Sequence, residues 1–404
     1  MKYDFTSILD RRGKDAAAYD NVGAHVIAPA RPKEGFDIIP MWVADMNFPV
    51  VPTITEAIIA RAQHPSFGYF FPTDKYYDSI VQWHEKRNGV TGLTKEHIGY
   101  ENGVLGGVVS ALNVLCSRGD NVLVHSPTYS GFTSCLTNAG YSIVLSPLVQ
   151  DEQGIWRMDF EDMEKKIVAN HIHTALFCSP HNPTGRVWSE EELRRVADIC
   201  ARNGVLLFSD EIHFDFIAPG HRHTVLATLD EQTRDNCIVG TSASKTFNLA
   251  GLSTANIIIP NDTLRRRFRA KTDGYTGGYT GYFGLTATRT AYEKGEAWLD
   301  ALLVHLEGNF RLCREFLAQR FPSVWMAPWE GTYLLWADFS CLGLTPEEQE
   351  RFMRDEAGLY LDEGYIFGRE GAGFERMVLA CPRLQLERAL ERLDQAAARR
   401  GLPR

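Results

Sequence analysis

Residues 174–185 read TALFCSPHNPTG, an apolar run that ends in a turn rich in proline, asparagine and glycine. A short apolar run bounded by turn residues is typical of a buried strand. Comparable runs occupy residues 121–125, 142–145, 205–208, 238–241 and 254–259. Because amphipathic segments alternate with these runs, the pattern predicts an α/β fold with a mostly parallel sheet between helices.

The clearest of the amphipathic segments predicts a helix over residues 190–202. Ser189 and Glu192 have the spacing of a capping box, and Asn203-Gly204 provides a stop at the other end. Residues 271–284, rich in glycine, tyrosine and threonine, are expected to form a mobile loop.

After residue 285 the pattern changes to that of a smaller α+β unit. It predicts a long helix over 285–319, a strand at 332–339, a helix at 346–356, a strand at 377–380 and a final helix from residue 384. We expect a large domain of residues 48–289, and a small domain built from residues 1–47 and 290–404.

Composition narrows the class of protein. The 404 residues carry 42 basic and 51 acidic side chains, a net charge of −9, which disfavours a nucleic-acid partner. The 8 cysteines contain no CxxC pair and the histidines no HExxH, so no metal site is expected. Without a leader-like start or an apolar run of about 20 residues, we expect a cytoplasmic protein with no membrane partner.

Polar side chains follow four of the expected strands, at the edge where open α/β sheets bind ligands. They are Tyr129, Asn182, Asp210 and Lys245. Each has a structural alternative, since Asp210 could cap a helix, Asn182 could form a turn and Lys245 could be solvated. Together they favour a ligand with a protonated nitrogen, because a lone buried carboxylate is costly.

A glycine-containing run, ENGVLGG at residues 101–107, precedes a helical pattern at 108–115. Small residues let the N–H groups of a helix N-terminus approach an anion, although the run matches neither a P-loop nor a dinucleotide fingerprint. A phosphate cradle, a stacking tyrosine, an acid for a ring nitrogen and an amine for a Schiff base together point to pyridoxal phosphate.

Three motifs carry a family resemblance: SPHNPTG at 179–185, SDEIH at 209–213 and SASKTFN at 242–248. They resemble those of fold-type I pyridoxal-phosphate enzymes of the aminotransferase class I/II superfamily. The chain is most similar to the MalY/PatB group of cystathionine β-lyase-like C–S lyases in DRRG at 10–13, MWVADMNF at 41–48, FGY at 67–69 and ACPR at 380–383. The resemblance covers essentially the whole chain. It implies a large cofactor-binding domain and a smaller α+β domain.

The resemblance implies a role for each matching residue. Lys245 would carry the cofactor and then remove the substrate Cα proton, and Asp210 would hold the proton of the ring nitrogen. Tyr129 would stack on the ring as a catalytic residue. Asn182 would contact the phenolic oxygen and the substrate.

The remaining implied contacts concern the phosphate and the substrate. The resemblance places Gly103, Val104 and Ser242 around the phosphate, and it implies that Ser244 also binds the cofactor. Tyr69 would reach the phosphate of a neighbouring subunit, which implies a homodimer with shared active sites. Ala44 and Arg383 would bind the substrate, with Arg383 gripping its α-carboxylate through two hydrogen bonds.

Three positions depart from the wider pattern. Ser253 lies eight residues beyond Lys245, where many aminotransferases have an arginine on the phosphate. His213 replaces a tyrosine, and would either contact the phenolic oxygen or pack. Both changes occur in the C–S lyase group and favour a lyase. Asn47 replaces the usual aspartate, which removes a negative charge near the expected substrate entrance.

The sequence therefore predicts a β-lyase that cleaves cystathionine or an L-cysteine S-conjugate to a thiol, pyruvate and ammonia. Two alternatives remain open, an aminotransferase on the same scaffold and a cofactor-binding regulatory protein. Movement of the amino group to a keto acid distinguishes the first alternative, and a biological role that survives loss of Lys245 distinguishes the second.

Overall fold

The computed structural model describes residues 3–23, 37–275 and 281–404, and within these ranges its largest sheet has eight strands. Their spatial order is β2 (Ile98–Glu101), β9 (Ala255–Ile258), β8 (Cys237–Thr241), β7 (Leu206–Asp210), β6 (Thr174–Cys178), β3 (Asn121–Ser126), β4 (Ser142–Gln150) and β5 (Trp156–Met158). The strands from β8 to β4 pair in parallel, and those at the two edges pair antiparallel. The expected α/β fold with a mostly parallel sheet is confirmed.

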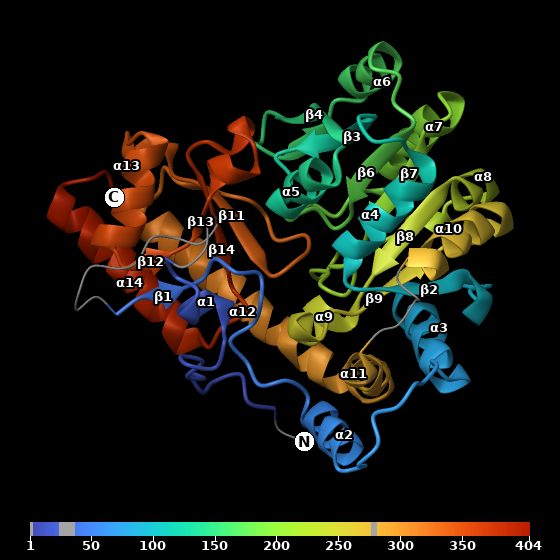
Figure 1. Cartoon of the computed structure of the whole chain (residues 1–404). Helices are drawn as coiled ribbons and strands as arrows, with labels where there is room; N and C mark the ends of the chain where they lie inside the picture. Colours follow the sequence, from blue (N-terminus) through green and yellow to red (C-terminus); the bar gives the residue numbers. More distant parts are fainter. Residues whose placement is uncertain (1–2, 24–36, 276–280) are drawn as a thin grey trace.

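Helices cover both faces of this sheet (Figure 1). One face packs against α4 (Val104–Leu115), α5 (Ser130–Ala139) and α10 (Asp262–Tyr275). The other packs against α6 (Phe160–Ala169) and α7 (Glu190–Arg202). All residues of β6 and β8 are therefore buried, which explains their uninterrupted apolar runs.

Helix α7 has the predicted bounds and the predicted cap. The Ser189 hydroxyl accepts from the N–H of Glu192 at 3.2 Å, and the Glu192 carboxylate accepts from the N–H of Ser189 at 2.8 Å. These two bonds satisfy donors that a helix N-terminus would otherwise leave unpaired.

The second part of the chain forms a separate antiparallel sheet. Its order is β10 (Trp325–Met326), β11 (Leu334–Asp338), β14 (Phe374–Val378) and β13 (Asp362–Glu363). The N-terminal segment lies with this second part of the chain, because β1 (Ile39–Pro40) and β12 (Leu359–Tyr360) pair in parallel in a further two-stranded sheet. The division into domains at residues 47/48 and 289/290 stays a prediction.

Further helices lie along the rest of the described chain. They are α1 (Ala17–Asp20), α2 (Pro52–Ala62), α3 (Asp74–Asn88), α8 (Glu231–Asp235), α9 (Ala243–Thr246), α11 (Tyr282–Lys294), α12 (Glu296–Arg320), α13 (Pro346–Arg351) and α14 (Arg383–Arg400). In the described ranges no helix is both long and apolar enough to cross a membrane.

Two expectations were wrong. The helix predicted over 285–319 is two helices, separated at Gly295, where a Cβ would lie 2.3 Å from Cε1 of Phe247 and 2.5 Å from the carbonyl of Ala291. The loop predicted over 271–284 is helical at 271–275 and 282–284, since α10 reaches Tyr275 and α11 begins at Tyr282 after its N-cap Gly281. Residues 276–280 lie outside the described residues.

Candidate active site

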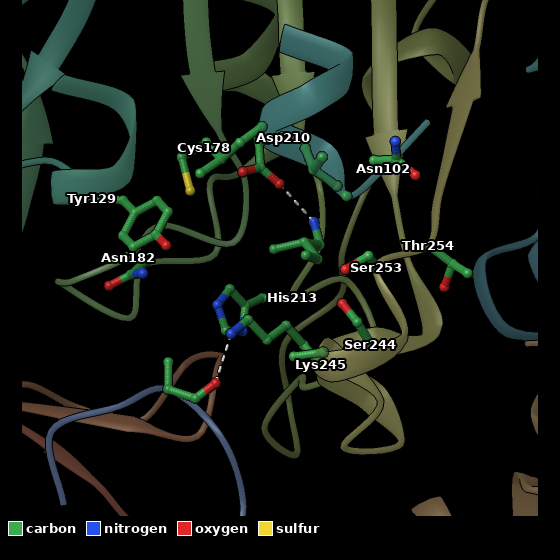
Figure 2. Close-up of a pocket in the computed structure, with 16 residues that line it drawn as sticks. Asn102, Tyr129, Cys178, Asn182, Asp210, His213, Ser244, Lys245, Ser253 and Thr254 are labelled. Atoms are coloured by element: carbon green, nitrogen blue, oxygen red, sulfur yellow. Dashed lines mark hydrogen bonds between the residues drawn. The ribbon is translucent and has the colours of Figure 1, made fainter. Parts of the chain in front are cut away.

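A cavity of about 230 Å³ opens at the carboxyl ends of the parallel strands. It brings together most of the side chains that the sequence singled out (Figure 2). They are Tyr129, Asn182, Asp210, His213, Ser244 and Lys245. Ala44, Gly103 and Val104 also line it, whereas Ser242, Tyr69 and Arg383 do not.

Lys245 lies on the short helix α9, directly after β8. Its side chain is half-buried because it lines the cavity, and its Nζ donates to the carbonyl of Ala44 at 2.6 Å. Burial lowers the pKa of the Lys245 amine from 10.5 to about 8, and the positive charge of Arg376 also lowers it. A neutral amine, which is both a nucleophile and a base, is therefore accessible near neutral pH.

Asp210 is the last residue of β7 and is buried in the wall of the cavity (Figure 2). One carboxylate oxygen accepts from the N–H of Ile212 at 3.0 Å. Burial raises the pKa of Asp210 from 3.8 to about 7, because the ionised form has lost its hydration. A ligand with a protonated nitrogen would restore the charge balance.

Asn182 follows β6 and meets an arginine that sequence reasoning missed. The Asn182 Oδ1 accepts from Nη1 of Arg376 at 2.9 Å. Arg376 lies in the middle of β14, only 4 % exposed, and its Nη2 donates to the carbonyl of Trp42 and to the Asp362 carboxylate. Among the described residues its Nε–H has no acceptor. An arginine within a fully buried strand that also carries Glu375 is the signal that could have identified it.

Arg383 requires a correction. It is the first residue of α14, and it lies against α12 rather than in the cavity. A Cβ added to Gly308 of α12 would come within 2.2 Å of its Nη2. The physical reason is that β14 ends at Val378, so the chain has left the sheet edge before Arg383 is reached.

The N-terminus of α4 forms one end of the cavity. Gly103 caps this helix with a φ of +80°, a left-handed conformation that favours glycine. Asn102, Ser253 and Thr254, which were not among the predicted site residues, lie around the same end (Figure 2). Among the described residues that line the cavity, Lys245 is the one cationic side chain.

Ser242 supports this end from behind. Its hydroxyl accepts from the N–H of Ser244 at 3.0 Å and donates to the carbonyl of Thr254 at 2.5 Å. The hydroxyl of Ser242 thus positions two residues of the cavity wall, which is why it does not point into the cavity itself.

Two rings flank the cavity. Tyr129 is the N-cap residue of α5. Its ring lies over Gly131, where an added Cβ would be only 2.3 Å from Cε1 of Tyr129. The His213 ring packs edge-on against Tyr333, and its Nδ1 lacks a partner in the described part of the chain. Burial lowers the pKa of His213 well below its usual value, so the ring is neutral and offers a nitrogen to a ligand.

Asn47 and Tyr69 do not line this cavity. Asn47 is 5 % exposed, and its Oδ1 accepts from Nη1 of Arg11 at 3.2 Å, so its expected place near a substrate entrance stays a prediction. The Tyr69 side chain is 99 % exposed.

The donor set fits pyridoxal phosphate. A buried acid with no ion pair among the described residues, an aromatic face, an amine and a helix N-terminus with hydroxyl groups match its ring nitrogen, ring, aldehyde and phosphate. No group of three or more histidine, cysteine, aspartate or glutamate residues in the described ranges could hold a metal ion.

Comparison with known proteins agrees with this geometry. The family model for aminotransferase class I and II matches residues 37–393. Cystathionine β-lyase PatB of Bacillus subtilis is 36% identical over 360 residues, covering 89% of this chain and 92% of PatB. Protein MalY of Escherichia coli is 30% identical and covers 98% of both chains. The structure of cystalysin from Treponema denticola, which contains pyridoxal 5′-phosphate, superposes with a TM-score of 0.93 at 34% identity, over 99% of this chain and 100% of cystalysin.

Proposed function

Because this chain belongs to the aminotransferase class I and II family, we propose that it is a pyridoxal-phosphate-dependent C–S β-lyase. It cleaves cystathionine or an L-cysteine S-conjugate to a thiol, pyruvate and ammonia. The relative named cystathionine β-lyase PatB matches 89% of the chain, which supports this activity. The observation that carries the proposal is the cavity lined by the Lys245 amine, the buried Asp210 and Asn182, whose Oδ1 accepts from Arg376.

Pyridoxal phosphate, when bound, supplies an electron sink for the bonds at the substrate Cα. In this chain Asp210 would hold the proton of the ring nitrogen, and its burial makes that charge pair strong. Tyr129 would cover one face of the ring. Asn182 and His213 would meet the phenolic oxygen, one through its amide and the other through its free Nδ1.

Lys245 would hold the cofactor covalently and later move a proton from the substrate Cα. Its lowered pKa, about 8, makes both roles possible near neutral pH, since the amine is a base only when it is neutral. The carbonyl of Ala44, 2.6 Å from Nζ, provides an acceptor for the amine whenever it is not joined to the cofactor.

The substrate carboxylate would bind Arg376 rather than Arg383. Arg376 is already held by Asn182, Trp42 and Asp362, and its unfilled Nε–H lies in the same buried region. An arginine fixed in this way meets a carboxylate with little loss of side-chain freedom. The arginine therefore selects amino-acid substrates by their α-carboxylate.

The phosphate would rest on the N–H groups of Gly103 and Val104 and on the hydroxyl of Ser244. Since Lys245 is the one cation among the described lining residues, a second subunit would complete this end of the site. Tyr69 is the candidate, because it stands in an exposed aromatic group with Phe67 and Phe71, which are 62% and 75% exposed. Apolar groups of this kind mark interfaces, which supports a homodimer with shared sites.

We place the protein in the cytoplasm. All eight cysteines, each within the described ranges, are free thiols, as is typical of a reducing compartment.

Release of pyruvate from cystathionine tests the activity. The wild-type protein should form pyruvate, and Lys245→Ala should lose activity by a factor on the order of 10³, because both attachment and proton transfer depend on this amine. Full activity in Lys245→Ala would contradict the proposal.

A further inference from the structure

The backbone of residues 44–48 is fastened to the segment that carries Lys245. The Ala44 carbonyl accepts from Nζ of Lys245 at 2.6 Å and from the hydroxyl of Tyr333 at 2.7 Å (Figure 2 shows the first). Asn248 accepts from the N–H of Met46 at 3.0 Å and donates to the Met46 carbonyl at 3.0 Å. The position of the Lys245 amine therefore depends on where this segment lies.

An ion pair from outside the cavity holds the same segment. Arg11 meets Asp45 through two parallel bonds, Nη1 to Oδ1 at 3.0 Å and Nη2 to Oδ2 at 2.6 Å. Nη1 also donates to the carbonyl of Met46 at 3.3 Å and to Oδ1 of Asn47 at 3.2 Å. The Arg11 and Asp45 side chains are only 17% and 18% exposed, so water screens their charges weakly.

Few charges act on the Lys245 amine. Asp45 and Asp210 favour its charged form, and Arg376 disfavours it. His213 and Tyr333 are both neutral, because burial lowers the pKa of the first and raises that of the second. Asp45 has the largest effect of the charged groups on the pKa of Lys245, and it follows directly after the residue that accepts from Nζ.

We propose that Arg11 and Asp45 are positioning residues, whose ion pair holds the Ala44 carbonyl against the Lys245 amine and balances the charge beside it. The inference rests on the proposed function only in taking Lys245 as the residue that joins the cofactor. Neither Arg11 nor Asp45 lines the cavity, so both act through Ala44 and through the field they create.

The signs of the expected effects follow from Coulomb's law. Loss of Arg11 leaves Asp45 uncompensated, which stabilises the Lys245 ammonium and moves its reactivity to higher pH. Loss of both the Arg11 and the Asp45 charge removes this excess of negative charge beside Lys245. A carboxylate at position 47 would also meet Arg11, so Asn47→Asp should shift reactivity in the same direction as loss of Arg11, without removing the guanidinium.

The test follows attachment of pyridoxal phosphate to cofactor-free, full-length protein by visible absorbance across a pH series. Arg11→Met should move the midpoint of the attachment rate upward by on the order of one pH unit. Arg11→Met/Asp45→Asn should return it close to the wild-type value. The matched control is Arg12→Met, since the Arg12 side chain is 68% exposed and pairs with Asp10 on the surface.

An unchanged midpoint in Arg11→Met would overturn the proposal, as would a double variant that stays displaced. If Arg11→Met does not fold, the midpoint measured for Asn47→Asp tests the proposal instead, because this variant adds a negative charge beside the same guanidinium. Acetylation of Lys245 over the same pH series, followed by mass spectrometry, reads the amine without any cofactor. Protein in which this readout shifts but no cofactor attaches would contradict the proposed function and leave the ion-pair inference supported.

Discussion

Arg376 keeps its Nε–H without an acceptor in the described chain, although a buried unsatisfied donor costs about 1–3 kcal/mol. A carboxylate ligand that reached this N–H would remove that cost. Its other contacts, to Asn182, Trp42 and Asp362, come from three separate parts of the chain.

Arg376→Lys should raise KM for the amino-acid substrate by about 10- to 100-fold, because lysine cannot reproduce charged bonds from a planar fork. Arg383→Lys is the matched control, and it should change KM less than about twofold, since Arg383 lies outside the cavity. Steady-state kinetics on both variants decides. A larger effect at residue 383 than at residue 376 would restore the original assignment.

Asp210 should make the stability of the cofactor-free protein depend on pH. Its pKa rises from 3.8 to about 7 on folding, so the folded state binds the proton more tightly and stability falls as pH rises through this window. Asp210→Asn removes the titratable group and with it this loss of stability at higher pH. The variant should gain about 2–3 kcal/mol relative to wild type between about pH 5 and about pH 8 in urea unfolding. A constant difference would contradict the assigned cause.

Among the helices and strands, the sequence predicted those whose formation depends on interactions within a few residues. Strand β6 and helix α7 have the expected bounds, because an apolar run and a capping box act within a few residues. The short edge strands β2 and β5 were missed, since their pairing partners rather than their own composition define them. The break between α11 and α12 falls at Gly295, where a Cβ would lie 2.3 Å from Cε1 of Phe247, a distant neighbour that the pattern of residues 285–319 does not contain.

The residues of the candidate site could likewise be predicted only where a nearby sequence pattern determines their position. Side chains directly after strands, such as Asp210 and Lys245, could be predicted because parallel strands end at one edge. Arg376 could not, because it reaches Asn182 only through the pairing of β14 with β11 and β13. The family resemblance pointed to Arg383 as the substrate arginine, whereas the fold brings Arg376 to Asn182.

The close approach of β8 to α4 gives a prediction at this scale. A Cβ at Gly240 would lie 2.9 Å from Cγ1 of Val104 and 3.1 Å from the Phe208 ring. Gly240→Ala should therefore cost about 1–3 kcal/mol and displace the start of α4, which weakens binding of pyridoxal phosphate. The control is Gly251→Ala, where a Cβ meets nothing within 4 Å. Unfolding curves and cofactor titration check both, and equal behaviour of the two variants would contradict this packing.

At the scale of the whole molecule, each cavity is expected to need a second copy of the chain. In a shared site, Lys245 comes from one subunit and Tyr69 from the other. A dimer of one Lys245→Ala chain and one Tyr69→Ala chain therefore keeps one intact site. After subunit exchange, an equimolar mixture should recover about a quarter of wild-type activity. A mixture of Lys245→Ala with Asp210→Asn is the control and should recover none, because both residues belong to the same chain's cavity. Equal recovery in the two mixtures would contradict shared sites.

The net charge of −9 describes the surface but not the cavity. Lys245 and the N-terminus of α4 line the cavity, and Arg376 lies beside it through Asn182, so positive groups stand where a phosphate and a carboxylate are expected. The absence of a nucleic-acid partner stays a prediction from composition, whereas this placement of positive groups arises only from folding.

The central claim is that this cavity directs cleavage of the Cβ–S bond rather than transfer of the amino group. The most direct measurement supplies the purified holoenzyme with cystathionine and a keto acid, and quantifies every product. The account predicts thiol, pyruvate and ammonia in equal amounts, with the added keto acid unchanged. An aminated keto acid, formed while the thioether stays intact, would contradict it and identify the protein as an aminotransferase.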